Sequence, residues 1–200
     1  GRHRVLCGDS TKRDDIERLI DRKKIDATIK DTPYNVGIKY NEYTNDNQSK
    51  EKFIEWCKKW GDLSSSKKIL TVGIQRLVWW DSIFGDPQWI IAWIKRNGQG
   101  NTNLLGTNKW DAILLYNVPQ DMGIDIIEIN NDYSEKIKEN KNHPTAKPIG
   151  LYNILLRRFT TNKELIFYPF GGSGSTLIAC EQTNRICFMC EISPVYIDVI

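Results

Sequence analysis

The segment that most restricts how this chain can fold is residues 167–193, FYPFGGSGSTLIACEQTNRICFMCEIS. Its order predicts a strand, a glycine-rich turn, a helix and a second strand that ends in Glu191. Glycines at a helix N-terminus let the backbone approach a ligand closely, and an acid at the tip of the next strand can accept hydrogen bonds from ribose hydroxyls. The segment therefore predicts a nucleoside-binding unit within a parallel α/β sheet.

The rest of the chain repeats this alternation of strand and helix, which favours a mainly parallel sheet with helices on both faces. We expect Ser10 or Thr11 to cap the first helix, and we expect Thr145 to open the third helix with Pro148 in its first turn. Apolar runs predict strands at 2–9, 26–30, 67–74, 88–96, 110–118, 163–170 and 185–192. Helical spacing predicts helices at 12–23, 51–63, 147–160, 175–184 and 193–200.

Composition favours one soluble domain, since 200 residues with 40% hydrophobic content include no apolar run long enough for a membrane span. The net charge of +3 permits a polyanionic partner without requiring one. Five cysteines in mostly apolar settings suit reduced thiols in the cytoplasm. Because the chain begins with Gly1 and stops within a helical pattern, we expect a domain cut from a longer protein.

The glycine loop narrows the choice of cofactor. It contains no lysine, which a phosphate-binding P-loop needs, and Leu177 stands where a dinucleotide fingerprint has its third glycine. A dinucleotide oxidoreductase is therefore disfavoured. An adenosine-bearing cofactor without a pyrophosphate remains, and S-adenosyl-L-methionine fits that description.

A second cluster, Asp31-Thr32-Pro33-Tyr34, follows the strand predicted at 26–30. The simplest interpretation of this tetrapeptide is a turn, because Asp and Pro are common turn formers. An acid, a rigid turn and an aromatic face at a strand end can also hold a base. The tetrapeptide alone does not decide between the two.

Five motifs taken together resemble those of the amino-group DNA methyltransferases of the permuted beta class. The likeness covers nearly the whole chain and extends to methyltransferase domains that follow ParB-like domains. It implies a Rossmann-like α/β fold with a mainly parallel, circularly permuted seven-stranded sheet, S-adenosyl-L-methionine as cofactor and double-stranded DNA as partner. A fused ParB-like domain or a restriction partner would be consistent with it. In chain order the motifs are GDS (8–10), DTPY (31–34), HPTAKP (143–148), FGGSGST (170–176) and EISPVY (191–196).

The resemblance implies methyl transfer to the exocyclic amine of a flipped base. Adenine N6 is favoured over cytosine N4, because an Asp-led tetrapeptide is more usual for adenine enzymes of the family. No metal is needed, since the donor is already an activated sulfonium. The alternative is a catalytically weakened or inactive DNA-binding or cofactor-binding remnant, because Thr32 replaces the family's proline and Tyr168 replaces its aspartate.

The chemistry of a poorly nucleophilic amine assigns roles to the tetrapeptide. Asp31 would accept one N–H bond, a carbonyl near Thr32 or Pro33 would accept the other, and Tyr34 would stack on the extruded base. The resemblance implies that Glu191 would hold the ribose hydroxyls and that Asp9 would lie near the adenine amine. By resemblance, the remaining cofactor-binding residues are Lys147, Phe170, Gly171, Gly172, Ser173, Gly174 and Thr176.

Contact with DNA is predicted from a short recognition insert around residues 96–142. Arg96 and Lys109 lie between two predicted strands of this region, where the family approaches DNA. Their charge suits phosphate contacts, which position a protein on DNA without reading its sequence.

Overall fold

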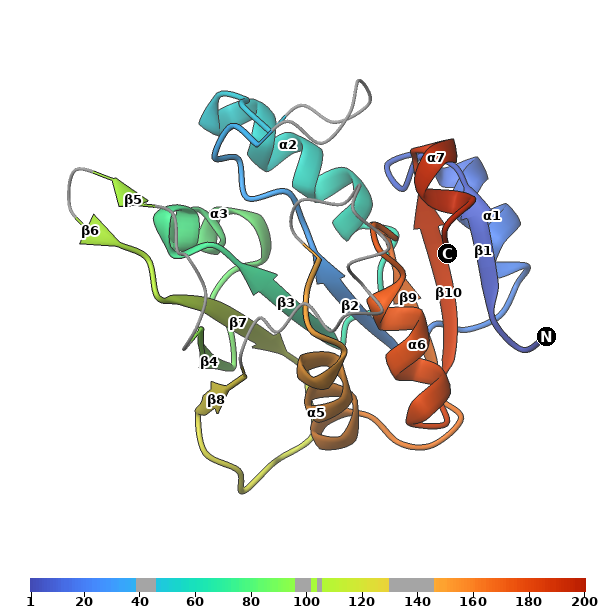
Figure 1. Cartoon of the computed structure of the whole chain (residues 1–200). Helices are drawn as coiled ribbons and strands as arrows, with labels where there is room; N and C mark the ends of the chain where they lie inside the picture. The colour runs from blue at the N-terminus through green and yellow to red at the C-terminus, as the bar shows by residue number, and fades with distance from the viewer. Residues whose placement is uncertain (39–45, 96–101, 104–105, 130–145) are drawn as a thin grey trace.

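The computed structural model describes residues 1–38, 46–95, 102–103, 106–129 and 146–200 of the chain (Figure 1). Eight strands form one sheet in the order β1-β10-β9-β2-β3-β7-β4-β8, and a separate β5–β6 pair forms a two-stranded ribbon. β7 runs antiparallel to both of its neighbours, and the other strand pairs of the large sheet are parallel. The strands are β1 Arg4–Cys7, β2 Ala27–Asp31, β3 Lys68–Val72, β4 Trp89–Ile94, β5 Thr102–Asn103, β6 Gly106–Thr107, β7 Trp110–Tyr116, β8 Ile126–Glu128, β9 Leu165–Tyr168 and β10 Ile186–Glu191.

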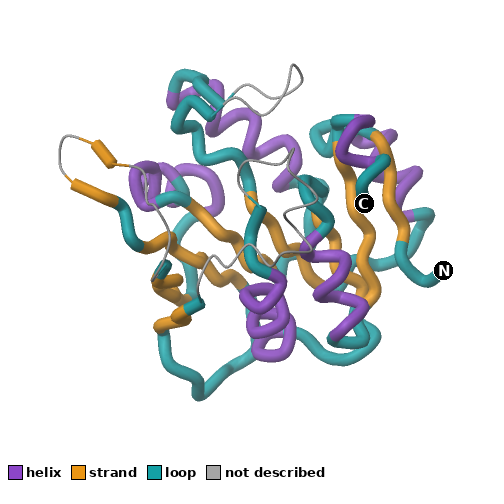
Figure 2. The backbone as a smooth tube through the Cα atoms, viewed as in Figure 1, coloured by secondary structure: helices purple, strands orange, loops and turns teal. Residues whose placement is uncertain are grey.

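Helices cover both faces of the sheet (Figures 1 and 2). On one face, α5 and α6 bury side chains such as Leu155 and Ala179 against Ile29 and Ile166. On the other face, α1 and α2 bury Ile16 and Trp60 against their own parts of the sheet. Side chains alternate along a strand, so neighbouring residues of β2 face different helices. The helices are α1 Arg13–Ile20, α2 Lys50–Gly61, the 3-10 helix η1 Ile74–Trp79, α3 Asp81–Phe84, α5 Ile149–Phe159, α6 Ser175–Gln182 and α7 Pro194–Ile197.

The structure confirms each of the seven strands predicted for the sheet and adds an eighth, β8. Residues 119–142 show no strand pattern in the sequence, because a three-residue strand is too short to display alternation. β8 forms through its parallel pairing with β4, from Ala92↔Ile126 to Ile94↔Glu128. The prediction of seven strands was therefore one short at this edge of the sheet.

Two predictions about where helices begin were wrong. The N-cap of α1 is Lys12, with no side-chain cap, so neither Ser10 nor Thr11 caps the helix. Thr11 donates both its N–H and its hydroxyl to Asp9 Oδ1. Pro148 is the residue before α5 rather than part of its first turn. Thr145 lies outside the described residues.

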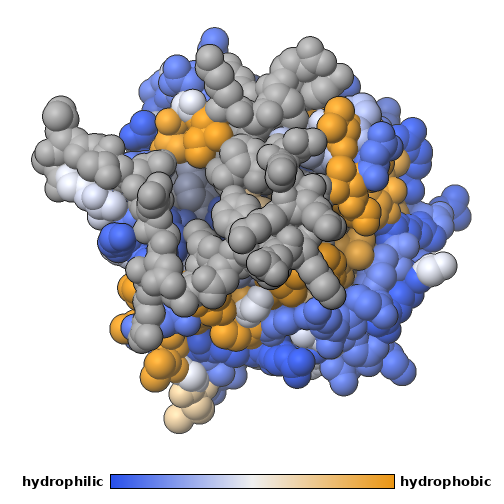
Figure 3. Space-filling model, viewed as in Figure 1, coloured by the Kyte–Doolittle hydropathy of each residue, from blue (hydrophilic) through white to orange (hydrophobic). Residues whose placement is uncertain are grey.

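No helix in the described ranges is both long and apolar enough to cross a bilayer. In the space-filling view much of the coloured surface is hydrophilic, and apolar residues gather in separate patches (Figure 3).

Candidate active site

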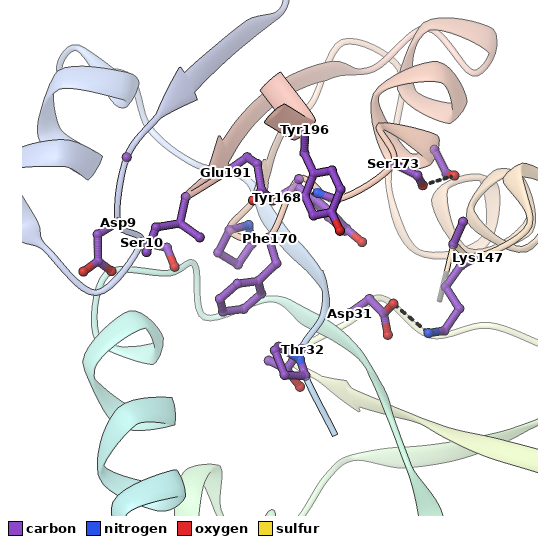
Figure 4. Close-up of a pocket in the computed structure, with 18 of the residues that line it drawn as sticks. Asp9, Ser10, Asp31, Thr32, Lys147, Tyr168, Phe170, Ser173, Glu191 and Tyr196 are labelled. Carbon is purple, nitrogen blue, oxygen red and sulfur yellow. Dashed lines mark hydrogen bonds and ion pairs between the residues drawn. The ribbon is translucent and has the colours of Figure 1, made fainter. Parts of the chain in front are cut away.

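The site is a pocket at the carboxyl ends of the parallel strands, where β2, β9 and β10 end in Asp31, Tyr168 and Glu191 (Figure 4). Parallel strands bring these ends to the same edge of a sheet, which is where open α/β sheets bind ligands. The residues that line the pocket are Gly8, Asp9, Ser10, Asp31, Thr32, Pro33, Gln48, Phe53, Trp56, Ala146, Lys147, Tyr152, Tyr168, Pro169, Phe170, Gly171, Gly172, Ser173, Ser175, Glu191, Ile192 and Tyr196.

Asp31 is held by hydrogen bonds to both of its carboxylate oxygens. Thr71 of β3 donates its hydroxyl to Oδ1 at 2.9 Å, and the Lys147 ammonium lies 2.7 Å from Oδ2. The ion pair is largely shielded, since the Asp31 and Lys147 side chains are 13% and 10% exposed. The carboxylate is therefore fixed in orientation at the edge of the pocket.

Tyr34 is fixed from several sides, although it is not among the residues that line the pocket. Its hydroxyl donates to Asp111 Oδ2 at 3.2 Å, and the Lys95 ammonium lies 3.0 Å from the other Asp111 oxygen. Lys147 Nζ lies 4.8 Å from the centroid of the Tyr34 ring. Beside the ring is Gly73, where an added Cβ would come within 2.7 Å of Tyr34 Cδ2.

The loop after the tetrapeptide depends on two buried residues that the sequence analysis did not single out. Asp46 accepts the backbone N–H groups of Asn35, Val36 and Ile38 at 2.7, 3.1 and 2.9 Å. Asn35 adopts a left-handed backbone with φ 56° and exchanges two hydrogen bonds with the backbone of Gln48. Asp46 lies in a polar stretch without periodicity, so only its three-dimensional contacts reveal its role.

The glycine loop and Glu191 form one unit. Glu191 accepts the backbone N–H of Gly172 on Oε2 and that of Ser193 on Oε1, both at 2.8 Å. A side chain at Gly171 would bring a Cβ to 2.9 Å from the Glu191 Cβ, so glycine permits this close packing. Gly174, with φ 76°, begins α6 in a left-handed conformation that glycine adopts without strain. Burial raises the pKa of Glu191, and the backbone N–H bonds partly offset that shift.

Tyr168, at the position where the resemblance has aspartate, pairs with another tyrosine. Its hydroxyl lies 2.9 Å from that of Tyr152 on α5, and the two rings meet edge to face at 5.9 Å. Tyr168 is 4% exposed and Tyr152 is 1% exposed. Burial, more than the nearby Asp31 charge, raises the pKa of Tyr168, and burial also raises that of Tyr152. Both hydroxyls therefore stay neutral.

Four further predicted residues are placed less favourably for the roles expected of them. Asp9 lines the pocket, but its Oδ1 is engaged by Thr11. Gly174 and Thr176 belong to the turn and helix behind the lining, and Thr176 is buried. Lys109 is exposed and lies outside the pocket lining. Arg96 lies outside the described residues.

An aromatic wall from α2 completes the pocket. Trp56 lies 5.3 Å from the ring of Phe170, and Phe53 lies 6.1 Å from Trp56. The sequence places both α2 residues on a helix with apolar spacing, which is equally typical of a helix that only packs in a core. Their place beside the glycine loop is decided by how α2 docks on the sheet.

This arrangement suits an adenosine-bearing ligand. The glycine turn, the aromatic wall, an acid that could bind ribose hydroxyls (Glu191) and a second carboxylate (Asp31) all line one pocket. A mainly parallel sheet with such a pocket at its carboxyl edge defines a nucleoside-cofactor enzyme of the methyltransferase type. The family model described as DNA methylase, which covers N6 and N4 enzymes, matches residues 25–200. The chain belongs to this N6/N4 DNA methylase family, whose members are S-adenosylmethionine-dependent DNA methyltransferases.

Individual relatives agree with this assignment. The chain is 23% identical to the Type II methyltransferase M.HpaI of Haemophilus parainfluenzae over 233 residues, covering 98% of the chain and 72% of that protein. A 50-residue stretch is 40% identical to the putative methylase YubD of Escherichia coli (strain K12), covering 25% of the chain and 22% of that protein.

Solved structures share the fold at low identity. The M1.HpyAVI–SAM complex superposes with a TM-score of 0.69 at 16% identity, over 98% of this chain and 96% of that one. The cytosine-N4-specific PvuII DNA methyltransferase superposes with a TM-score of 0.74 at 14% identity, over 98% and 83%. These likenesses confirm the Rossmann-like α/β methyltransferase fold with a mainly parallel sheet that is expected from the sequence, and the circular permutation stays a prediction.

Proposed function

We propose that this protein transfers a methyl group from S-adenosylmethionine to adenine N6 in double-stranded DNA. The observation that carries the proposal is the position of Asp31, at the end of β2 and on the wall of the pocket that the glycine loop also lines. The preference for adenine rests on the Asp-led tetrapeptide. The resemblance to M.HpaI, a Type II methyltransferase by name, also suggests a role in restriction-modification.

The target amine is a poor nucleophile, because its lone pair is delocalised into the base. Asp31 would accept one N–H bond and a backbone carbonyl of Thr32 or Pro33 the other, so that the lone pair turns toward the methyl donor. The base must leave the duplex to reach them, and Tyr34 offers a ring for stacking. S-adenosylmethionine supplies a methyl group on a sulfonium, which needs no metal for activation.

Several groups that line the pocket would bind the cofactor. Phe170 with Trp56 offers an aromatic surface, the Gly172 turn offers backbone, and Glu191 offers carboxylate oxygens. Ser173 and Lys147 lie on the side of the pocket toward α5 and α6 (Figure 4). For DNA, Arg96 and Lys109 stay predictions as phosphate contacts.

The test is a methyl-transfer assay with labelled S-adenosylmethionine and unmethylated DNA, digestion to nucleosides and identification by mass spectrometry. N6-methyladenine is the expected product. N4-methylcytosine as the product would support the same mechanism with cytosine, instead of adenine, as the target base. A folded sample that binds S-adenosylhomocysteine and methylates neither base would contradict the proposed activity.

That last outcome would support a second candidate, a non-catalytic cofactor-binding and DNA-binding protein. The observation that favours it is the pair of replacements near the reacting groups, Thr32 in the tetrapeptide and Tyr168 on the pocket wall. Thr32 is buried, and its hydroxyl has no hydrogen-bond partner among the described residues.

A further inference from the structure

We propose that Arg76 of η1, together with Lys50 of α2, binds phosphates of the DNA strand that carries the flipped base. The inference rests on the proposed function and concerns the rim of the site, since neither residue lines the cofactor pocket. It adds a DNA contact to those expected from the sequence at Arg96 and Lys109. DNA would then lie over η1 and the first turn of α2 as well.

The first observation is that Arg76 lies within one turn of the residue that touches the ring of Tyr34. η1 begins after Gly73, whose carbonyl accepts the backbone N–H of Arg76 at 3.2 Å. Gly73 packs against Tyr34, because an added Cβ would come within 2.7 Å of Tyr34 Cδ2. A base stacked on Tyr34 stays joined to its own strand, so the phosphates beside it come within reach of the long Arg76 side chain.

The second observation is that the Arg76 guanidinium donates to no other group in the part of the chain that the structure describes. Its Nε atom is buried without a hydrogen-bond partner, although buried polar atoms in folded proteins nearly always have one. The protein thus supplies this arginine with neither a carboxylate nor a carbonyl. An acceptor for its donors must come with a ligand.

The third observation is that Trp79 holds the guanidinium in a pose that suits a phosphate. Arg76 Cζ lies 4.6 Å from the centroid of the Trp79 ring, and that ring lies 5.9 Å from the ring of Phe53. Stacking occupies the face of the guanidinium, so the donors at its edge can bond to two oxygens of one phosphate. Because the side chain is already stacked, it loses little conformational freedom when the phosphate binds.

The fourth observation is a second cation on the neighbouring element. Lys50 is exposed and lies three residues before Phe53, so the two side chains are neighbours on the first turn of α2, beside Trp79. The acid of this turn, Glu51, is engaged at the cap, where hydrogen bonds with its own backbone N–H and with the N-cap side chain lower its pKa. Two cations from adjacent elements suit the successive phosphates of a strand better than a base edge, which presents donors as well as acceptors.

Fluorescence anisotropy with a labelled duplex of arbitrary sequence, titrated at several KCl concentrations, tests the inference. Arg76→Gln should weaken binding about tenfold to a hundredfold, the usual range for one charge-assisted contact. The slope of log K against log [KCl] should become shallower by about 0.9, because one phosphate contact is lost. Arg76→Lys should keep most of the slope, since lysine also neutralises a phosphate. Arg157→Gln, at an exposed position in the last turn of α5, is the control and should change neither quantity.

Lys50→Gln tests the same surface at an exposed position, where the substitution leaves the core untouched, and should also make the slope shallower. In the methylation assay, Arg76→Gln should raise KM for DNA and keep kcat and the Kd of S-adenosylhomocysteine within about twofold, which a merely structural role would not predict.

An unchanged salt slope in both the Arg76→Gln and the Lys50→Gln protein would overturn the inference. Weakening confined to duplexes that contain guanine would also overturn it, because arginine would then read a base edge. Both outcomes leave the proposed function standing as long as the unmodified protein methylates DNA. Absence of DNA binding by the unmodified protein would overturn both.

Discussion

Gly73 leaves no room for a side chain beside the ring of Tyr34, and Gly73→Ala tests whether the position of that ring matters for methyl transfer. Gly73 has φ −72°, which alanine adopts without strain, so the effect of the substitution comes from contact alone. The new Cβ would lie 2.7 Å from Tyr34 Cδ2 and 3.1 Å from Cγ. Carbon atoms in contact prefer about 3.5–4.0 Å, so the ring must move by about 1 Å.

The expected effect follows from that displacement. The Tyr34 hydroxyl lies 3.2 Å from Asp111, and a shift of the ring would weaken this hydrogen bond as well as move the stacking face. A misplacement of about 1 Å can lower the rate about a hundredfold. At 1.36 kcal/mol for each tenfold, this is about 2.7 kcal/mol of transition-state stabilisation. Overpacking should also lower the free energy of unfolding by about 1–3 kcal/mol.

The assay compares kcat/KM for methyl transfer with the Kd of S-adenosylhomocysteine in the same preparation. We expect kcat/KM to fall and Kd to stay within about twofold, because Gly73 does not line the pocket. Gly150→Ala is the control, since its Cβ would lie 3.6 Å from Ile129 in ordinary contact. Unchanged kcat/KM in a folded Gly73→Ala protein would refute the stacking role of Tyr34.

Three further predictions concern other parts of the chain. Asp31→Ala should lower methyl transfer by more than about a hundredfold without weakening S-adenosylhomocysteine, and retained turnover would remove Asp31 from the mechanism. Burial lowers the pKa of Lys30, whose ammonium lies 3.8 Å from the ring centroids of Trp60 and Trp80, so the unfolded chain binds this proton more readily. The free energy of unfolding should therefore rise with pH from the lowered pKa toward 10.5. Lys30→Met should flatten this rise in urea titrations at several pH values, whereas Lys58→Met, at an exposed position, should not. Cys7 is exposed and the other four cysteines are buried, with the pKa of Cys57 raised to about 11 and that of Cys190 to about 12 mainly by burial. Native protein should therefore react with one equivalent of iodoacetamide and unfolded protein with five, as counted by mass spectrometry; rapid labelling of all five in the native state would contradict this burial.

The sequence by itself determined seven strands of the large sheet, the glycine loop and the acid at the end of β10. Alternating apolar runs and turn residues act over a few neighbours, so they predict where a strand such as Leu165–Tyr168 lies and where it ends. The ends of parallel strands meet at one edge, which is why Asp31 and Glu191 could be predicted to share a site. The strand β8 was not predicted, because three residues are too few to show an alternating pattern, and it forms through its pairing with β4.

Only the tertiary structure decided which side chains meet within that site. Asp31 and Lys147 are 116 residues apart, and their contact depends on how α5 docks against the sheet. The Tyr152–Tyr168 hydrogen bond and the fit of Tyr34 against Gly73 likewise depend on packing between separate elements. Local preferences fix the backbone of each element, but the register and docking of elements distant in sequence fix which charges pair. For that reason the sequence predicted a carboxylate and a lysine at one site, and the structure paired them.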